Sequence, residues 1–155
     1  MTLPHEVLLV QTACLPDFEK ITSAFAFIFQ GESLLLAELD RGWDLPGGHL
    51  EAGETPEVAL RREILEEAAV VAGPLKMLGY QHLKILAPMP EGYGYPYPDS
   101  YLLFYVGDAV SQEEFKPDED SVGGRFFSFA EASDVPWVAN HSALFLAAQK
   151  LWLEK

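Results

Sequence analysis

Residues 48–70, GHLEAGETPEVALRREILEEAAV, constrain the fold of this chain more than any other segment. Thr55 is a favourable N-cap residue, and Pro56 suits the first helical position, where a backbone N–H would have no helical partner. These two residues predict that a helix begins here. We expect the helix to end near Gly73, because glycine commonly follows the last helical residue.

The predicted helix carries acidic residues on one side and apolar residues on the other. At about 100° per residue, Glu63, Glu66 and Glu67 fall together. The apolar positions opposite them are Leu60, Ile64, Leu65, Ala68, Val71 and Ala72. Like charges three or four residues apart destabilise a helix by roughly 0.2–0.5 kcal/mol per pair, and a hard divalent cation would compensate them. The alternative is an acidic face exposed to solvent.

The order of residues in this segment resembles the signature of the Nudix hydrolases. The signature G-x5-E-x7-R-E-apolar-x-E-E-x-G-apolar is matched at Gly48, Glu54, Arg62, Glu63, Ile64, Glu66, Glu67 and Val70. Ala69 departs from it, because the family has glycine there. Alanine in the left-handed conformation costs roughly 1 kcal/mol, whereas alanine in a continuing helix costs nothing. We therefore expect the helix to continue through Ala69 towards Val71.

The resemblance implies a metal site on the acidic face. Glu66 and Glu67 are expected to be the main ligands of Mg²⁺ or Mn²⁺, with Glu63 and the carbonyl group of Gly48 contributing. Such a metal neutralises charge on a diphosphate and lowers the pKa of a bound water, which attacks phosphorus. Glu63, Glu66 and Glu67 are thus candidate catalytic residues as well as candidate ligands.

Two further residues are assigned candidate catalytic roles. Arg62 is expected to position Glu54 or Glu66 through paired hydrogen bonds rather than to bind the substrate. Many relatives use a glutamate outside the signature to complete the metal site or to act as a base. Glu119, in the acidic segment 113–120, is the candidate here, and the alternative is a solvated run of charge.

Residues 88–99 are too rich in proline and glycine to form a regular element, and they predict an ordered or lid-like loop. Tyr93, Tyr95 and Tyr97 lie within this loop. They either pack the loop onto the rest of the chain or stack on a nucleobase, and both alternatives stay open. With these tyrosines, His49 is a candidate for substrate binding.

Apolar patterns predict strands at about residues 6–13, 22–30, 33–39, 75–86, 100–107 and 122–129, and a final helix at about 136–153. Residues 30–33 predict a hairpin turn. Strands before, between and after two helices favour an α/β protein with a central mixed β-sheet, and the resemblance implies the α/β/α sandwich of the Nudix fold. The 155 residues, 49% of them hydrophobic, are expected to form one domain, 1–155.

Composition limits the partners of this chain. It has 24 acidic and 10 basic residues and a formal charge of −14, which argues against binding long nucleic acid. A small nucleotide or nucleotide derivative chelated by metal is compatible with that charge. No apolar run is long enough to span a membrane, so no membrane partner is expected. The lone Cys14 predicts a buried thiol in a reducing cytoplasm. The sequence is compatible with a homodimer.

The resemblance implies hydrolysis of a nucleoside diphosphate linked to another group. The leading substrate is a nucleoside triphosphate, which would give a monophosphate and pyrophosphate. ADP-ribose, a nucleotide sugar or a dinucleotide are the alternatives within this enzyme class. The rival from another class is a non-catalytic Nudix domain that only binds a nucleotide, and the presence of all three glutamates argues against it.

Overall fold

The computed structural model describes residues 4–114, 116 and 121–154. Strands in this part of the chain are β1 (His5–Gln11), β2 (Ile21–Gln30), β3 (Ser33–Leu39), β4 (Gly42–Asp44), β5 (Gly47–His49), β6 (Val70–Ala72), β7 (Lys76–Ile85), β8 (Asp99–Gln112) and β9 (Ser121–Ser128). Helices are α1 (Pro56–Ala68), α2 (Phe129–Ser133), α3 (Pro136–Asn140) and α4 (Ser142–Leu153), with a 3₁₀-helix at Phe18–Lys20. The predicted strands are therefore confirmed, with small shifts at their ends and a longer β8.

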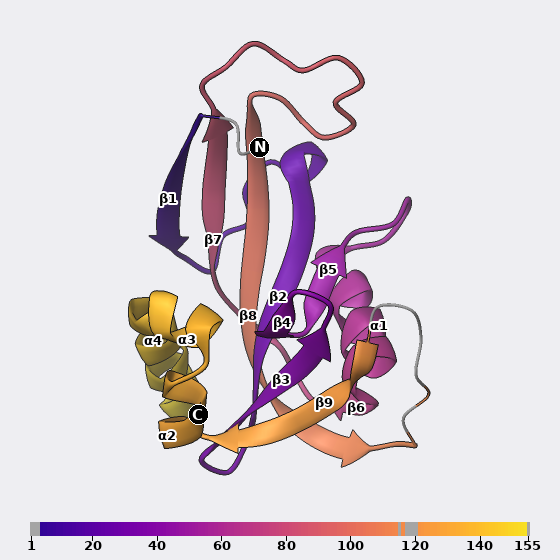
Figure 1. The fold of residues 1–155 in the computed structure, drawn as a ribbon, viewed down its shortest axis with the longest axis vertical. Coiled ribbons are helices and arrows are strands. Elements are labelled where there is room, and N and C mark those ends of the chain that lie inside the picture. The colour runs from indigo at the N-terminus through magenta and orange to yellow at the C-terminus, as the bar shows by residue number, and fades with distance from the viewer. Residues whose placement is uncertain (1–3, 115, 117–120, 155) are drawn as a thin grey trace.

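The sheet is mixed, as predicted. Its strands run in the order β1-β7-β8-β2-β3-β4, and β2 pairs with β8 in parallel while the other pairs are antiparallel. The edge of β2 opposite β8 is shared between two strands. It pairs with β3 at Phe29 and Gln30, and with β5 at residues 23–25. This divided edge makes β5 a strand of the sheet that lies beside α1 (Figure 1).

Strand β2 shows why the sheet is covered on both faces. Alternate side chains of a strand point to opposite faces. Ala26 and Ile28 pack in the cluster that includes α1, whereas Phe27 and Phe29 pack in the cluster that includes α3 and α4. All four are fully buried. The result is the predicted α/β/α sandwich, with α1 on one face and α2, α3 and α4 on the other (Figure 1).

Helix α1 begins as predicted but ends earlier than predicted. The Thr55 hydroxyl accepts a hydrogen bond from the Val58 N–H at 3.3 Å, which caps the start of the helix. The expectation that the helix continues through Ala69 is wrong. Ala69 has φ 55° and ψ 35°, which is left-handed, and it closes α1 by donating its N–H to the Leu65 carbonyl at 2.9 Å.

Strand pairing explains why Ala69 is held in this conformation. Val70 and the next two residues form β6, which pairs with the far end of β8. The Glu113 N–H donates to the Ala69 carbonyl at 2.7 Å, and Val70 is fully buried. Several backbone hydrogen bonds and a buried valine together outweigh the roughly 1 kcal/mol that left-handed alanine costs.

Three other expectations need correction. The final helix is divided at His141, whose φ of −125° ends α3 before α4 begins. The preceding helix α2 was not predicted, although Ser128 and Glu131 form a capping box that marks its start. Cys14 is exposed rather than buried, because it follows β1, a largely exposed strand at the edge of the sheet.

Candidate active site

The candidate site forms where α1 lies against β5. At Gly47, φ is 146°, and a Cβ atom there would lie 2.2 Å from the carbonyl oxygen of Ala24. Only glycine permits this close approach of β5 to β2. The Gly47 N–H donates to Glu67 Oε1 at 3.1 Å, so the same residue also fixes a carboxylate of α1.

Glu67 is buried, with 7% of its surface exposed, whereas Leu65 is 42% exposed. The prediction that Leu65 lies among the buried apolar residues is therefore wrong, and Glu67, predicted on the side opposite the core, is itself buried. The glycines of β5 leave room for carboxylates instead: a Cβ atom on Gly48 would lie 3.0 Å from the Glu63 carboxylate. Burial and, to a smaller extent, the neighbouring Glu63 raise the pKa of Glu67 to about 8, although the hydrogen bond from the Gly47 N–H acts to lower it.

Arg62 connects the glutamates of this site. Its Nε and Nη2 donate to the two carboxylate oxygens of Glu54 at 2.8 and 2.9 Å, one of the two paired arrangements that the sequence suggested. Its Nη1 donates to Glu63 at 2.9 Å and to Glu66 at 3.3 Å. The Arg62 guanidinium, with the Glu51 N–H, lowers the pKa of Glu54 to about 2. The guanidinium is thus occupied by three carboxylates.

Arg62, Glu63, Glu66 and Glu67 line a cavity of about 410 Å³, called here the carboxylate pocket. Its lining residues are Leu39, Asp40, Arg41, Gly47, Gly48, His49, Glu51, Arg62, Glu63, Glu66 and Glu67. The glutamates offer oxygen donors, which suit Mg²⁺ or Mn²⁺. Within the described part of the chain, however, no three acidic, histidine or cysteine side chains converge into a ready-made metal site. Glu63 and Glu66 are turned towards Arg62 instead.

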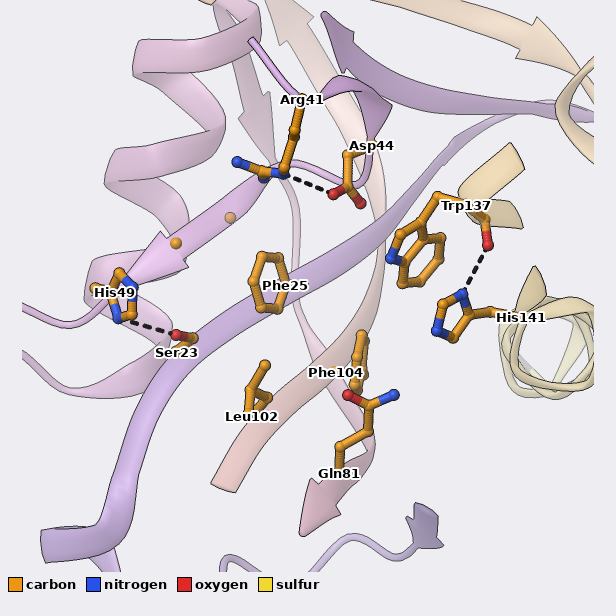
Figure 2. A pocket seen from close by; sticks show the side chains of 12 residues that line it. Ser23, Phe25, Arg41, Asp44, His49, Gln81, Leu102, Phe104, Trp137 and His141 are labelled. Atoms are coloured by element: carbon orange, nitrogen blue, oxygen red, sulfur yellow. Dashed lines mark hydrogen bonds and ion pairs between the residues drawn. The ribbon is translucent and has the colours of Figure 1, made fainter. Parts of the chain in front are cut away.

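A second cavity of about 190 Å³, the aromatic pocket, adjoins the first and shares with it Arg41 and the three residues of β5. Phe25 and Phe104 lie within it with ring centroids 5.9 Å apart (Figure 2). Trp137 and His141 stack on each other at 4.1 Å, and His141 Nδ1 lies 2.7 Å from the Trp137 carbonyl. Because a carbonyl only accepts, Nδ1 carries the hydrogen there.

The tyrosine-rich segment, residues 86–98, joins the end of β7 to the start of β8 (Figure 1). His49 stacks on Tyr95 with centroids 5.3 Å apart, and both line a third cavity with Tyr93. Tyr97 does not line this cavity, and its hydroxyl donates to the Ala87 carbonyl within the loop. The structure thus brings together three of the four predicted substrate-binding residues. Glu119 lies outside the described residues.

The family of this chain follows from its sequence and its fold together. The model of the NUDIX domain matches residues 19–148, which include the carboxylate pocket and most of the sandwich. The chain belongs to the Nudix family. The expectation drawn from residues 48–70 is confirmed, and the roles assigned to individual residues of this Nudix domain stay predictions.

Known Nudix proteins resemble this chain over different lengths. The RNA pyrophosphohydrolase of Helicobacter pylori strain G27 is 33% identical over 79 residues, 50% of this chain and 44% of that protein. The 8-oxo-dGTP diphosphatase of Haemophilus influenzae is 31% identical over 85 residues, 55% of this chain and 54% of that protein. The matches thus span about half of these curated relatives. A Bacillus subtilis pyrophosphohydrolase crystal structure has the same fold, with a TM-score of 0.72, 23% identity, and coverage of 94% of this chain and 89% of that chain.

Several residues of this Nudix site were not predicted from the sequence. Arg41 and Asp44 precede the signature, and a charged pair in a tight turn reads as a solvated surface feature. Trp137 and His141 are far from the signature in sequence and read as part of an apolar helix. A signal for them would have been the three-residue separation of Arg41 and Asp44, which suits an ion pair, and the four-residue separation of Trp137 and His141, which places two rings on one helical face.

Proposed function

We propose that this Nudix domain hydrolyses a diphosphate bond in a nucleotide, most directly a nucleoside triphosphate that is cleaved to a monophosphate and pyrophosphate. The observation that carries this proposal is one continuous arrangement of pockets. Glu63, Glu66, Glu67 and Arg62 line the carboxylate pocket, which adjoins an apolar, aromatic pocket. A nucleotide combines the same two chemistries in one molecule, a charged phosphate chain and a flat base.

The donors in the carboxylate pocket fit a hard divalent cation. Glu66 and Glu67, with Glu63 and the Gly48 carbonyl, are the residues that would hold Mg²⁺ or Mn²⁺. When bound, such a cation neutralises phosphate charge and lowers the pKa of water. The all-oxygen donor set of the pocket supports this assignment, and the turn of Glu63 and Glu66 towards Arg62 means that these side chains would reorient.

The residues of the chain itself prepare the site for an anionic substrate. Arg62 holds Glu54 and offsets the mutual repulsion of Glu63 and Glu66. Burial keeps the Glu67 carboxyl protonated near neutral pH, because its pKa is raised to about 8. Glu67 therefore gives up a proton when it becomes a ligand, which couples cation binding to pH.

Substrate selection is proposed to occur outside the carboxylate pocket. His49, Tyr93 and Tyr95 offer flat surfaces, and stacking on a base is one of the two roles open to these tyrosines. The name of the 8-oxo-dGTP diphosphatase relative supports a nucleoside triphosphate as substrate. ADP-ribose, nucleotide sugars and dinucleotides are the alternatives that a substrate screen separates from it.

RNA is a second candidate substrate class, because relatives are named RNA pyrophosphohydrolases. The net charge of −14 opposes contacts along a phosphate backbone. An RNA would therefore be held mainly through a phosphate-bearing end placed in the two pockets. Such binding should depend little on salt, since few backbone phosphates would be neutralised.

A substrate screen tests the proposal. The wild-type protein is incubated with Mg²⁺ and nucleoside triphosphates, ADP-ribose, nucleotide sugars, dinucleotides or a 5′-triphosphorylated RNA, and the products are separated. The matched control is Glu67→Gln, which keeps the size of the side chain and removes its ability to become an anionic ligand. Hydrolysis by the wild type and not by the control supports the proposal. Binding of nucleotides without any turnover by the wild type supports the non-catalytic alternative.

A further inference from the structure

Arg41 occupies the boundary between the two main pockets. Strands β3 and β4 form a hairpin in which Leu39 pairs with Gly42, so Asp40 and Arg41 form its tip. Arg41 lines both the carboxylate pocket and the aromatic pocket. Figure 2 shows its guanidinium extending from this tip above Phe25, with one edge held by Asp44. A group bound across the two pockets would pass this side chain.

Asp44 fixes Arg41 through one edge and leaves the other edge available. Arg41 Nε donates to Asp44 Oδ2 at 2.8 Å, and Asp44 Oδ1 accepts from the Leu45 N–H at 2.7 Å. Asp44 is buried, so this anchor is firm. Within the described residues, Nη1 and Nη2 of Arg41 donate no hydrogen bond. Two parallel N–H groups of this kind match the oxygens of a phosphate.

The charges of the site favour a basic side chain with available N–H groups, such as Arg41, next to the substrate phosphates. The carboxylates of Glu63 and Glu66 line the carboxylate pocket and repel an anionic phosphate chain. Arg62 also lines the pocket, but its guanidinium is occupied by Glu54, Glu63 and Glu66. Of the two arginines in the pocket, Arg41 alone has unused donors among the described residues.

The volume of the aromatic pocket limits the size of the chemical group that can bind next to Arg41. Its volume of about 190 Å³ is smaller than the roughly 300–1,000 Å³ of pockets that hold drug-sized ligands. One planar ring system fits this space. The Gln81 amide and the Trp137 indole N–H also line it and make no hydrogen bond within the described part of the chain, so both can meet polar atoms at the edge of a ring.

We propose that Arg41, positioned by Asp44, binds the phosphate that joins a mononucleotide's base-bearing half to the group cleaved in the carboxylate pocket. This inference rests on the proposed function, because it assumes that a nucleotide spans both pockets. Arg41 is a phosphate-binding residue in this scheme. Asp44 is a positioning residue, since it acts only by holding the guanidinium edge-on to the substrate.

Binding measurements with Arg41→Ala test this assignment. A nucleoside, its monophosphate and its α,β-methylene triphosphate analogue, whose bridging carbon prevents cleavage to pyrophosphate, are titrated by calorimetry into each protein with Mg²⁺. Loss of a hydrogen-bonded charge should weaken binding of the monophosphate and triphosphate roughly 10- to 100-fold. Nucleoside binding should stay unchanged. The matched control is Arg125→Ala, because the Arg125 side chain is also 54% exposed but lines neither pocket. It should leave all three affinities unchanged.

Equal weakening for the nucleoside and its phosphates would overturn the assignment, as would no weakening for any of them. Arg41→Lys serves if Arg41→Ala does not fold. It keeps the charge and loses the paired N–H groups, so phosphate binding should weaken less than with alanine. Binding by Arg41→Lys that is indistinguishable from wild type would contradict a role for the paired donors.

A double variant tests the positioning role of Asp44. Asp44→Asn alone should raise KM and leave kcat nearly unchanged, because it loosens the guanidinium. In an Arg41→Ala background, Asp44→Asn should have no further effect on KM. An additive effect would show that Asp44 acts independently of Arg41.

If wild type hydrolyses no diphosphate but Arg41→Ala still loses phosphate binding, the proposed function fails and the Arg41 assignment stands. If wild type hydrolyses a diphosphate and Arg41→Ala keeps its phosphate binding, the proposed function stands and the Arg41 assignment fails.

Discussion

The carboxylate pocket and the tyrosine-rich segment are held in place in different ways. The carboxylate pocket is fixed by backbone geometry and by charge. Gly47 allows β5 to approach β2 closely, and its N–H donates a hydrogen bond to Glu67. Arg62 donates hydrogen bonds to three glutamates. The tyrosine-rich segment lies between β7 and β8 and is held by side-chain contacts, such as the edge-to-face rings of Tyr93 and Tyr95 at 5.7 Å.

This difference indicates a division of roles. A site held by glycine backbone and paired charges has little freedom to vary, which suits chemistry common to all diphosphates. A segment held by aromatic contacts can present different surfaces without disturbing the sheet, which suits selection among substrates. Changes in the carboxylate pocket should therefore alter turnover of every diphosphate, and changes in the tyrosine-rich segment should alter which substrate is bound.

The largest effect is expected for the carboxylate pocket. Glu67→Gln or Glu66→Gln should reduce turnover by several orders of magnitude, because an anionic oxygen ligand is lost. Both variants should stay folded, since glutamine keeps the size of the side chain and Glu66→Gln also removes like-charge repulsion. Steady-state kinetics with Mg²⁺ and circular dichroism measure the two effects. Near-normal turnover in both variants would remove these residues from the chemistry.

A smaller effect is expected for the tyrosine-rich segment. If Tyr95 stacks on the base, Tyr95→Ala should weaken nucleotide binding by about 1–3 kcal/mol, by analogy with base stacking on aromatic residues. Binding of inorganic pyrophosphate should barely change. Tyr97→Phe is the control, because Tyr97 does not line the cavity that His49 and Tyr95 share. Equal losses for both ligands would assign Tyr95 to packing of the loop.

The buried Glu67 predicts how stability depends on pH. Its pKa is raised from the ordinary 4.5 to about 8, so the folded state holds a proton that the unfolded state has lost. Without metal, stability should therefore fall as pH rises from about 4.5 to about 8, by at most about 1.4 kcal/mol per pH unit from this group. Chemical denaturation at several pH values measures the slope.

Glu67→Gln should flatten that slope, because glutamine does not titrate. Mg²⁺ should stabilise the wild type more at pH 8 than at pH 6, since the ligand form of Glu67 is the deprotonated one. A pH dependence that is identical in the wild type and in Glu67→Gln would show that another group is responsible.

The smallest effect concerns the end of α1. Ala69 has φ 55°, a conformation that glycine adopts without strain, so Ala69→Gly should stabilise the protein by about 1 kcal/mol. Turnover should stay unchanged, because Ala69 lines neither pocket. Urea unfolding measures the gain. Destabilisation by 0.5–1 kcal/mol, roughly the value for a helix interior, would contradict the left-handed geometry.

The sequence predicted the parts of the fold that depend on local pattern. The start of α1 follows from Thr55 and Pro56, and the turn between β2 and β3 brings Gln30 opposite Ser33 as expected. The end of α1 was missed because it depends on β6 pairing with β8, a contact distant in sequence. Local propensity favoured a continuing helix at Ala69, and the sheet overrode it.

The site divides in the same way. Glu54 and Arg62 were identifiable because the signature fixes their spacing, and the structure pairs them directly. Arg41 and Trp137 were not identifiable, because the hairpin and the break before α4 bring them to the pocket. Their contribution depends on how the β3–β4 hairpin and α3 pack against the sheet, and no local sequence pattern indicates that packing.

Phosphorus NMR of the wild-type protein with Mg²⁺ and a nucleoside triphosphate tests the central claim most directly, because one spectrum reports both binding and cleavage. We predict that the triphosphate signals are replaced over time by those of a monophosphate and pyrophosphate, and that Glu67→Gln leaves them in place. Triphosphate signals that shift on binding to the wild type but persist, for this and every other diphosphate tried, would contradict hydrolysis and show a domain that only binds nucleotides.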